Sequence, residues 1–340
     1  MSFPFLRLPQ VILSIIVNLA EPKEIICLTQ CSKRAYNLVK TYRKKSENVK
    51  IVVNDFENNV KVFFDNKLNC RLSLDSLYGK WKLVEREYSK TTFFGADFRL
   101  SLYCEDESEW KLKWDDPTTD GVLTLIDWAT DLFRTDVWSL SVSKRTIHRL
   151  KWVESCQEHI KEVFLWAGNH TEDEIRCLFH SKANKFYLLS VPPTFDYSGI
   201  LPSRTSLGLC QGFWFTPNHL MTSDFMELSV NYSILTNSNV NQFLRHWLAG
   251  GSPRLKTLSL EIKEFSLNEI TRGIEGVIPN GDPRSQKYWT ISGRELTFND
   301  RMYLKRSDGV MATCSTIDYR IVRRIFVLAV WPDAKNRMPY

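Results

Sequence analysis

Short β-type segments recur along the second half of the chain, and this repetition limits its possible folds more than any other feature. Most alternate aliphatic and small or polar residues, the period of a strand with one buried face. They are Val137–Val142, Ile160–Leu165, Phe186–Val191, Phe225–Val230 and Leu255–Leu260, with a weaker member at Ser206–Leu209. Successive starts of the five lie 23, 26, 39 and 30 residues apart. Such spacings are typical of strand–helix units that stack on their neighbours.

Helix signals follow several of these segments. Thr171 with Glu174, and Ser266 with Glu269, have the spacing of a capping box. Asn239 is expected to cap a further helix, which Gly250-Gly251 would end. We therefore predict an α+β fold with a mixed, leucine-rich-repeat-like strand and helix domain.

The first 45 residues predict three short helices. Pro9 suits the first turn of the first helix. Glu21-Pro22 would end this helix, and Ser32 can cap the third. The aliphatic residues of the first helix share one broad face, and these are Val11, Ile12, Ile15, Ile16 and Leu19. Helices this short cannot bury so much apolar surface among themselves, so we expect it to cover another domain or a partner protein.

The string from Phe5 to Val39 resembles an F-box. Its Leu8-Pro9 opening, the aliphatic helix, the turn at Pro22-Lys23-Glu24-Ile25 and the Ser32-Lys33-Arg34 step follow F-box order, with Gln10 in place of the usual acidic residue. The resemblance implies docking on the acidic Skp-type adaptor of cullin-RING ubiquitin ligases. The adaptor-binding residues that we predict are Leu8, Pro9, Val11, Ile12, Ile15, Ile16, Leu19, Ile25, Ile26 and Leu28. A plain helical cap on the larger domain is the alternative.

A second resemblance lies further along the chain. Ser223–Leu260 resembles the type-2 F-box-associated region of nematode-type F-box proteins. It contains Asn237-Ser238, then Asn241-x-Phe243-Leu244-x-x-Trp247, then Gly251-Ser252-x-Arg254-Leu255. Residues 276–340 fit the β-rich end of the same family, with a hairpin turn at Ser307-Asp308-Gly309 and a final strand at Phe326–Trp331.

These patterns predict three domains. Residues 1–45 form the F-box, 46–145 a mixed α+β connecting region packed on it, and 146–340 the F-box-associated repeat-like domain, with its motif core at 194–260. The connecting region has a helix pattern with Leu125, Trp128, Ala129, Leu132 and Phe133 on one face. Its expected strands are Lys50–Val53, Val60–Phe64, Trp81–Val84, Phe98–Tyr103 and Trp110–Trp114. No stretch has the composition of a flexible linker.

Charge is concentrated at the N-terminal end. Residues 1–50 have nine Lys or Arg and three acidic residues, so they account for the whole net charge of +6. This distribution argues against a broad nucleic-acid-binding surface. A basic cluster consists of Lys40, Arg43, Lys44 and Lys45. We favour its interpretation as a solvated helix end, and a nuclear signal or a phosphate contact is the alternative.

The longest apolar run, Val11–Ala20, is too short to span a bilayer, so no membrane association is expected. Eight cysteines without a CxxC pair indicate reduced thiols, and we expect a cytoplasmic or nuclear protein.

Catalytic signatures are missing from the sequence. It contains no GxxxxGK[ST], GxGxxG, GxSxG or HExxH motif. The one metal-like pattern is Cys156-x-x-His159 with Cys177-x-x-His180, whose two pairs need not converge. We predict no catalytic residue, no cofactor and no metal. Phe213-Trp214-Phe215 is interpreted as a buried strand, with a recognition platform as the alternative.

The function predicted from these observations is a non-enzymatic substrate-recognition subunit of a cullin-RING (SCF-type) ligase, which holds an unknown target protein. The alternatives are an interaction module that binds partner and adaptor without promoting ubiquitination, and an enzyme with dispersed site residues. For the target we predict the outward strand face around Glu227, Ser229, Thr257 and Ser259. The loop Gly212–Asn218 is the alternative target-binding element.

Overall fold

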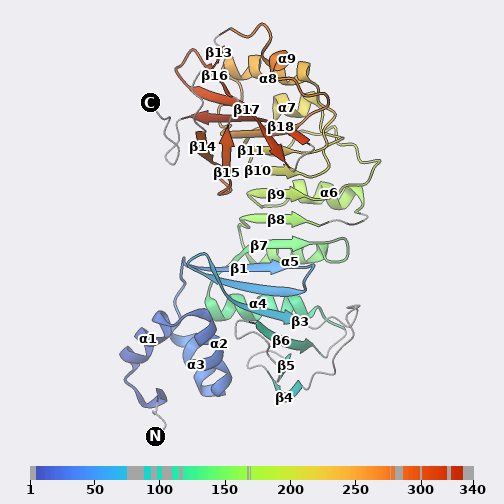
Figure 1. The fold of residues 1–340 in the computed structure, drawn as a ribbon. Coiled ribbons are helices and arrows are strands. Elements are labelled where there is room, and N and C mark those ends of the chain that lie inside the picture. Colours follow the sequence, from blue (N-terminus) through green and yellow to red (C-terminus); the bar gives the residue numbers. More distant parts are fainter. Residues whose placement is uncertain are drawn as a thin grey trace. The chain divides into compact units, whose positions relative to one another are not determined.

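The computed structural model divides the chain into two compact units, residues 1–163 and 164–340 (Figure 1). It describes residues 5–74, 88–92, 98–101, 109–114, 118–166, 168, 170–275, 277–279, 286–298, 301–319 and 323–331. The predicted α+β class is confirmed, with helices at the N-terminus followed by mixed strands and helices. The three domain limits that the sequence suggests stay a prediction.

The first unit begins with the three predicted helices. A short 3₁₀ turn at Phe5–Arg7 precedes α1 (Gln10–Leu19), α2 (Pro22–Cys31) and α3 (Lys33–Tyr42). Glu21 and Glu24 form a capping box at the start of α2. The Ser32 hydroxyl accepts a hydrogen bond of 3.1 Å from the backbone N–H of Ala35, so Ser32 caps α3 as predicted.

A sheet with two helices completes the first unit. Its strand order is β7-β1-β2-β3-β6-β5-β4. The strands are β1 (Val49–Asn54), β2 (Asn59–Phe64), β3 (Lys67–Leu74), β4 (Tyr88–Thr92), β5 (Phe98–Ser101), β6 (Glu109–Trp114) and β7 (Val137–Val142). The helices are α4 (Gly121–Phe133), which buries all five predicted apolar residues, and α5 (Ile147–Cys156). The predicted strand Trp81–Val84 lies outside the described residues.

The N-terminal helices pack directly on this sheet and on α4. Asn69 of β3 accepts a hydrogen bond of 2.7 Å from the backbone N–H of Lys23 and donates one of 2.8 Å to Glu21. Lys40 of α3 forms an ion pair of 2.5 Å with Asp131 of α4. These contacts connect the N-terminal helices to β3 and to α4.

Four parallel strands form the centre of the second unit, and β8 (Glu162–Leu165) contains the boundary between the units. The four are β9 (Lys185–Leu188), β10 (Arg204–Leu209), β11 (Phe225–Val230) and β12 (Thr257–Glu261). They pair in the order in which they occur in the sequence, so that Leu188, Leu209, Val230 and Leu260 lie in one row. Each predicted repeat strand is present, which confirms the leucine-rich-repeat-like pattern.

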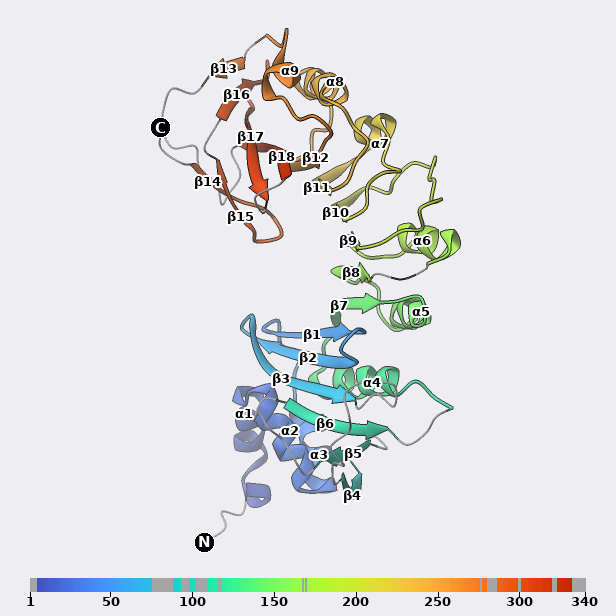
Figure 2. The same ribbon diagram turned by 45° about the vertical axis from the view of Figure 1, so that its right-hand side comes forward.

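Helices cover one side of these parallel strands (Figure 2). They are α6 (Glu172–Phe179), α7 (Pro217–Thr222), α8 (Asn237–Leu248) and α9 (Leu267–Thr271). Thr171 and Ser266 cap α6 and α9 as predicted. The prediction that Asn239 caps α8 is wrong, because the Thr236 hydroxyl accepts from the backbone N–H of Asn239, which lies one turn inside the helix.

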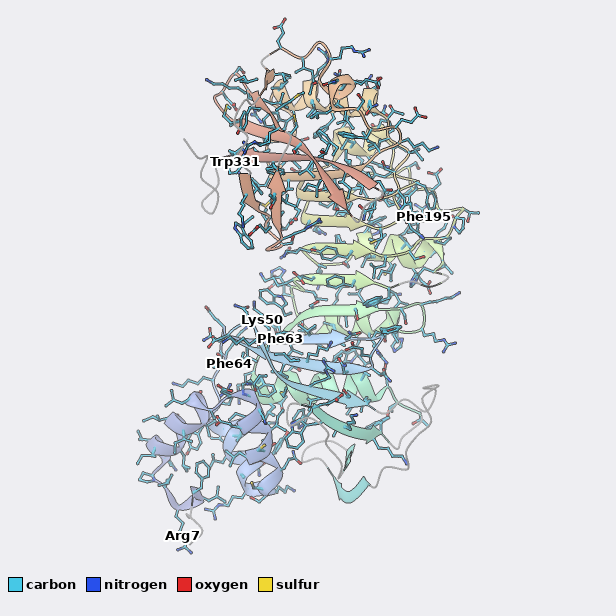
Figure 3. All side chains as sticks on the ribbon, viewed as in Figure 1. Arg7, Lys50, Phe63, Phe64, Phe195 and Trp331 are labelled. Atoms are coloured by element: carbon cyan, nitrogen blue, oxygen red, sulfur yellow. The ribbon has the colours of Figure 1, made fainter. Side chains whose placement is uncertain are left out.

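Antiparallel strands from the C-terminal part of the second unit continue the sheet beyond β12. Strand β18 (Arg323–Trp331) pairs with β12 and with β17 (Met311–Tyr319), which continues to β16 (Arg301–Lys305) and β13 (Val277–Pro279). The predicted turn at 307–309 joins β16 to β17, with Gly309 at a φ of 88°. A separate ribbon of β14 (Gln286–Trp289) and β15 (Glu295–Phe298) packs Tyr288 edge-on against Trp331, with ring centroids 5.0 Å apart. Trp331 is labelled in Figure 3.

Candidate protein-interaction surfaces

One face of α1 exposes large aliphatic side chains to solvent. Val11 is 71% exposed, Ile15 53% and Leu19 76%, and Ile12 and Ile16 are exposed beside them. The helix instead buries Leu13 and Val17 against the rest of the first unit. A contiguous apolar patch of this kind on a water-facing helix indicates a surface that another molecule covers. The sequence-based expectation of surplus aliphatic surface is confirmed.

The C-terminal end of α1 is held by polar contacts from the end of α3. Arg43 donates from Nη1 to the carbonyl oxygens of Val17 at 2.7 Å and Ala20 at 2.9 Å. Asn18 donates to the carbonyl of Tyr42 at 2.9 Å. Arg43 is buried, and this burial lowers the pKa of its guanidinium. Arg43 is therefore a structural cap and not part of a solvated helix end, which corrects the interpretation favoured by the sequence.

The predicted adaptor-binding residues fall into exposed and buried groups. Pro9 and the five α1 residues are exposed, whereas Leu8 and Leu28 are half-buried. Ile25 and Ile26 have no exposed surface. Their prediction as contact residues needs correction, because they pack inside the first unit and support the exposed helix without reaching solvent.

The predicted target face is partly covered by the chain itself. The Glu227 carboxylate accepts hydrogen bonds from the backbone N–H of Ser292 at 3.0 Å and from its hydroxyl at 2.8 Å. Glu227, Ser229 and Ser259 are half-buried, and they line a small cleft of about 230 Å³ together with residues of the β14–β15 ribbon.

Thr257 is only 1% exposed, so its prediction as an outward surface residue is wrong. It pairs with Ala329 of β18, which belongs to the apolar cluster around Tyr288. Tyr288 also donates from its hydroxyl to the carbonyl of Lys256 at 3.2 Å. The ribbon therefore buries the outward face of β12 at this position.

A larger groove lies at the carboxyl ends of the four parallel strands. Its volume is about 1210 Å³. The loops that follow the strands line it, with Leu189, Ser190, Val191, Pro192, Pro193, Cys210, Gln211, Phe213, Tyr232, Ser233, Ile234, Glu261, Ile262 and Lys263, beside Gly168 and His170. Apart from Phe213, in the alternative target loop, sequence analysis missed these residues. The available signal was their repeated position at the end of each predicted strand or directly after it.

The tripeptide Phe213-Trp214-Phe215 lies in a turn before α7 and not in a strand, which corrects its predicted secondary structure. Trp214 and Phe215 are nonetheless buried. Trp214 packs edge-on against Phe195, with centroids 5.1 Å apart. Only Phe213 of the three lines the groove.

No metal-ligand cluster occurs among the residues that the structure describes, where no three His, Cys, Asp or Glu side chains gather suitably. His180 of the metal-like pattern donates from Nδ1 to the carbonyl of Arg176 at 2.7 Å. The absence of a metal requirement stays a prediction. Within the described ranges, none of the helices is both long enough and apolar enough to cross a bilayer.

Comparison with known proteins matches two regions of the chain. Residues 5–47 match the family model of the F-box domain, and residues 197–260 match a model described as F-box associated. A Caenorhabditis elegans protein named Skn-1 dependent zygotic transcript 15 protein is 26% identical over 353 residues, covering 94% of this chain and 96% of that protein. No solved structure matches. The chain therefore contains a segment in its first unit that matches the F-box domain and, in its second unit, a segment that matches an F-box-associated region.

Proposed function

We propose that this protein is the substrate-recognition subunit of a cullin-RING (SCF-type) ubiquitin ligase. Its F-box binds a Skp-type adaptor, and its second unit binds a target protein. The exposed aliphatic face of α1 carries this proposal, because it lies within the residues that match the F-box domain. A non-enzymatic role follows, since such a subunit contributes binding surfaces and no reacting group.

The energetics of the α1 face suit protein docking. Complete burial of one large aliphatic side chain contributes about 1.5–3 kcal/mol, and α1 offers five that are exposed. Part of this gain offsets the loss of translational and rotational freedom on association. Truncating any one of them should therefore weaken the complex measurably.

Positive charge beside this face fits an acidic adaptor. Lys44 and Lys45 are exposed and line a hollow of about 430 Å³ together with Ile15 and Leu19. Lysines at the rim of an apolar patch raise the association rate with an acidic partner and help to orient it. The proposed adaptor contact thus combines an apolar centre with a basic rim.

A target held by the second unit would be modified through proximity. Tethering raises the effective concentration of target lysines near the conjugating enzyme of the ligase, without any catalytic group from this chain. The proposed F-box is joined to the sheet of the first unit by the Asn69 hydrogen bonds and to α4 by the ion pair of Lys40 with Asp131, so it is not a flexibly tethered module. We propose a cytoplasmic or nuclear location, where such ligases act.

Co-elution with purified adaptor and cullin tests the proposal. The full-length wild-type chain should form a complex with both. The double variant Leu8→Ala, Ile16→Ala should lose at least about 100-fold in adaptor affinity, since truncating one buried aliphatic residue costs about 2–5 kcal/mol. A double variant that unfolds at the wild-type urea midpoint yet binds the adaptor unchanged would contradict the proposal. Recovery of adaptor without cullin would support the interaction module instead.

A further inference from the structure

We propose that the groove at the carboxyl ends of β9, β10, β11 and β12 binds an extended, uncharged segment of the target protein that carries apolar side chains. This inference rests on the proposed function, because it states where the second unit holds its target and which chemistry it selects.

The groove is formed mainly by the segments that follow β9, β10, β11 and β12. Leu188, Leu209 and Val230 are aligned in register, and Leu189, Cys210 and Tyr232 follow at the same edge. In parallel sheets the carboxyl ends of the strands are the common position for binding sites, since the connecting loops there can vary without disturbing the strands. The repeat therefore places these loops side by side.

Apolar groups dominate the walls. Val191, Pro192 and Pro193 come from the loop after β9, and Phe213 comes from the loop after β10. Tyr232 and Ile234, from the loop after β11, are each 52% exposed. A groove of about 1210 Å³ exceeds the 300–1,000 Å³ typical of small-molecule sites, which favours a peptide segment over a metabolite.

The backbone on both sides of Phe213 is held in place before any partner binds. Its neighbour Gly212 approaches β11 so closely that an added Cβ would lie 2.2 Å from a methyl carbon of Val230. The backbone N–H of Gly212 donates to the carbonyl of Asn231 at 2.8 Å. On its other side, Trp214 and Phe215 are buried. A backbone that is already fixed on both sides of Phe213 loses little conformational entropy on binding, which favours affinity.

The charges of the groove exclude a strongly charged ligand. Among the described residues, its lining contains one carboxylate and one ammonium side chain, Glu261 and Lys263. The Glu261 carboxylate already accepts a hydrogen bond of 3.0 Å from the backbone N–H of Tyr232. His170 also lines the groove. It is buried, and its Nε2 forms a hydrogen bond of 2.7 Å with the carbonyl oxygen of Trp166. The part of the lining that the structure describes has no arginine cluster to bind a phosphorylated or acidic segment.

The outward strand face is less suited to this task. Glu227 is bonded to the β14–β15 ribbon, and the cleft there has a volume of about 230 Å³. A target segment would have to displace the ribbon, whereas the groove is open. Target binding is therefore assigned to the loops after the strands.

Peptide selection on the immobilised full-length chain tests this assignment. The probes are three pools of acetylated and amidated peptides of about ten residues, which reach about 33 Å when extended. One pool is uncharged with apolar residues, one is acidic and includes phosphoserine, and one is basic. We expect selection from the uncharged pool alone. Its best peptide should bind about tenfold more weakly to Ile234→Glu and to Phe213→Ala, as each removes one apolar contact.

Ile200→Glu is the matched control. Ile200 is a still more exposed isoleucine of the same unit, at 80%, and it does not line the groove. The control should bind the peptide like wild type. Selection from the acidic or basic pool, no selection at all, or equal losses in Ile200→Glu and Ile234→Glu would each overturn the assignment.

Adaptor binding is measured on the same preparations. Failure to bind adaptor refutes the proposed function, whereas intact adaptor binding without peptide selection refutes only the groove.

Discussion

Arg43 donates a hydrogen bond of 2.7 Å from Nη1 to the carbonyl oxygen of Val17, and so joins the end of α3 to the last turn of α1. The final carbonyls of a helix have no partner within the helix, and a cation there also complements the helix dipole. The same side of α1 buries Leu13. A buried guanidinium thus fixes the helix whose opposite face we propose to bind the adaptor.

Arg43→Met should therefore destabilise the first unit. The variant keeps most of the apolar stem but leaves two carbonyl oxygens without their donor, at a cost of about 1–3 kcal/mol for each buried group. Urea unfolding of the full-length chain measures the loss. Lys45→Met is the control, since Lys45 is exposed and should change stability by less than about 0.5 kcal/mol. Equal stability of the two variants would contradict the capping role.

Arg149→Met should lower the free energy of unfolding by more than Arg43→Met does, by about 3–5 kcal/mol. The substitution leaves carboxylate charges buried without a counterion. Arg149 Nη1 lies 2.5 Å from a carboxylate oxygen of Asp55, and Nε lies 2.7 Å from one of Asp120, the residue that caps α4. The control is Arg254→Met, which removes an exposed ion pair of 2.7 Å with Asp224 and should cost less than about 1 kcal/mol. Similar unfolding free energies for the two variants would refute a structural role for the buried network.

His219 should make stability depend on pH in the mildly acidic range. Burial lowers the pKa of its imidazole, although contacts with the carbonyls of Gly199 and Tyr197 and the charge of Asp196 oppose this shift. The unfolded chain then binds the proton more readily, so stability is full above the unfolded pKa of about 6.5 and declines as the pH falls below it. His219→Asn should flatten the wild-type slope of unfolding free energy between about pH 6.5 and 5, because asparagine carries no proton there. An unchanged slope would exclude His219 as the cause.

Asparagine suits this test because α8 already uses it in the same place. In α8, Asn239 accepts a hydrogen bond of 3.0 Å from the backbone N–H of Thr236. His219 accepts the equivalent bond from Thr216 in α7, at 3.2 Å. The variant therefore keeps the helix cap while it removes the titrating group.

Gly212→Ala should both destabilise the second unit and weaken peptide binding. The added methyl would overlap Val230, and overpacking of this kind costs about 1–3 kcal/mol. The resulting backbone shift would move Phe213 in the groove. Thermal unfolding and the peptide titration give the two measurements. Ser190→Ala, in the same groove, adds no atoms and should leave stability nearly unchanged. Wild-type behaviour of Gly212→Ala in both assays would contradict the proposed packing of this loop.

Local patterns predicted the elements of this fold well. The strands Val137–Val142 and Phe225–Val230 have the predicted limits, and Thr171, Ser32 and Ser266 cap helices as their spacing indicates. These signals depend on periodicity and on hydrogen bonds within one turn, which a single sequence contains.

Burial was harder to predict because it depends on distant segments. Helix α1 is apolar on two sides, so periodicity could not tell whether Leu13 or Ile15 faces inward. The alternation of apolar and polar residues along the strand predicts an outward position for Thr257, but residues 286–298 cover this position. The groove consists of loop residues without periodicity, and only the order of the parallel strands brings them together.

Calorimetric titration of the purified Skp-type adaptor into the full-length chain tests the central claim, that the exposed α1 face binds the adaptor. Ile15→Asp and Leu19→Asp would each place a carboxylate in an apolar interface, which costs several kcal/mol, so the Kd should rise by at least about 100-fold. Phe56→Asp, a substitution at an equally exposed apolar residue in the turn between β1 and β2, should leave the Kd within about twofold. A folded Leu19→Asp variant that binds the adaptor with the wild-type Kd would contradict the account.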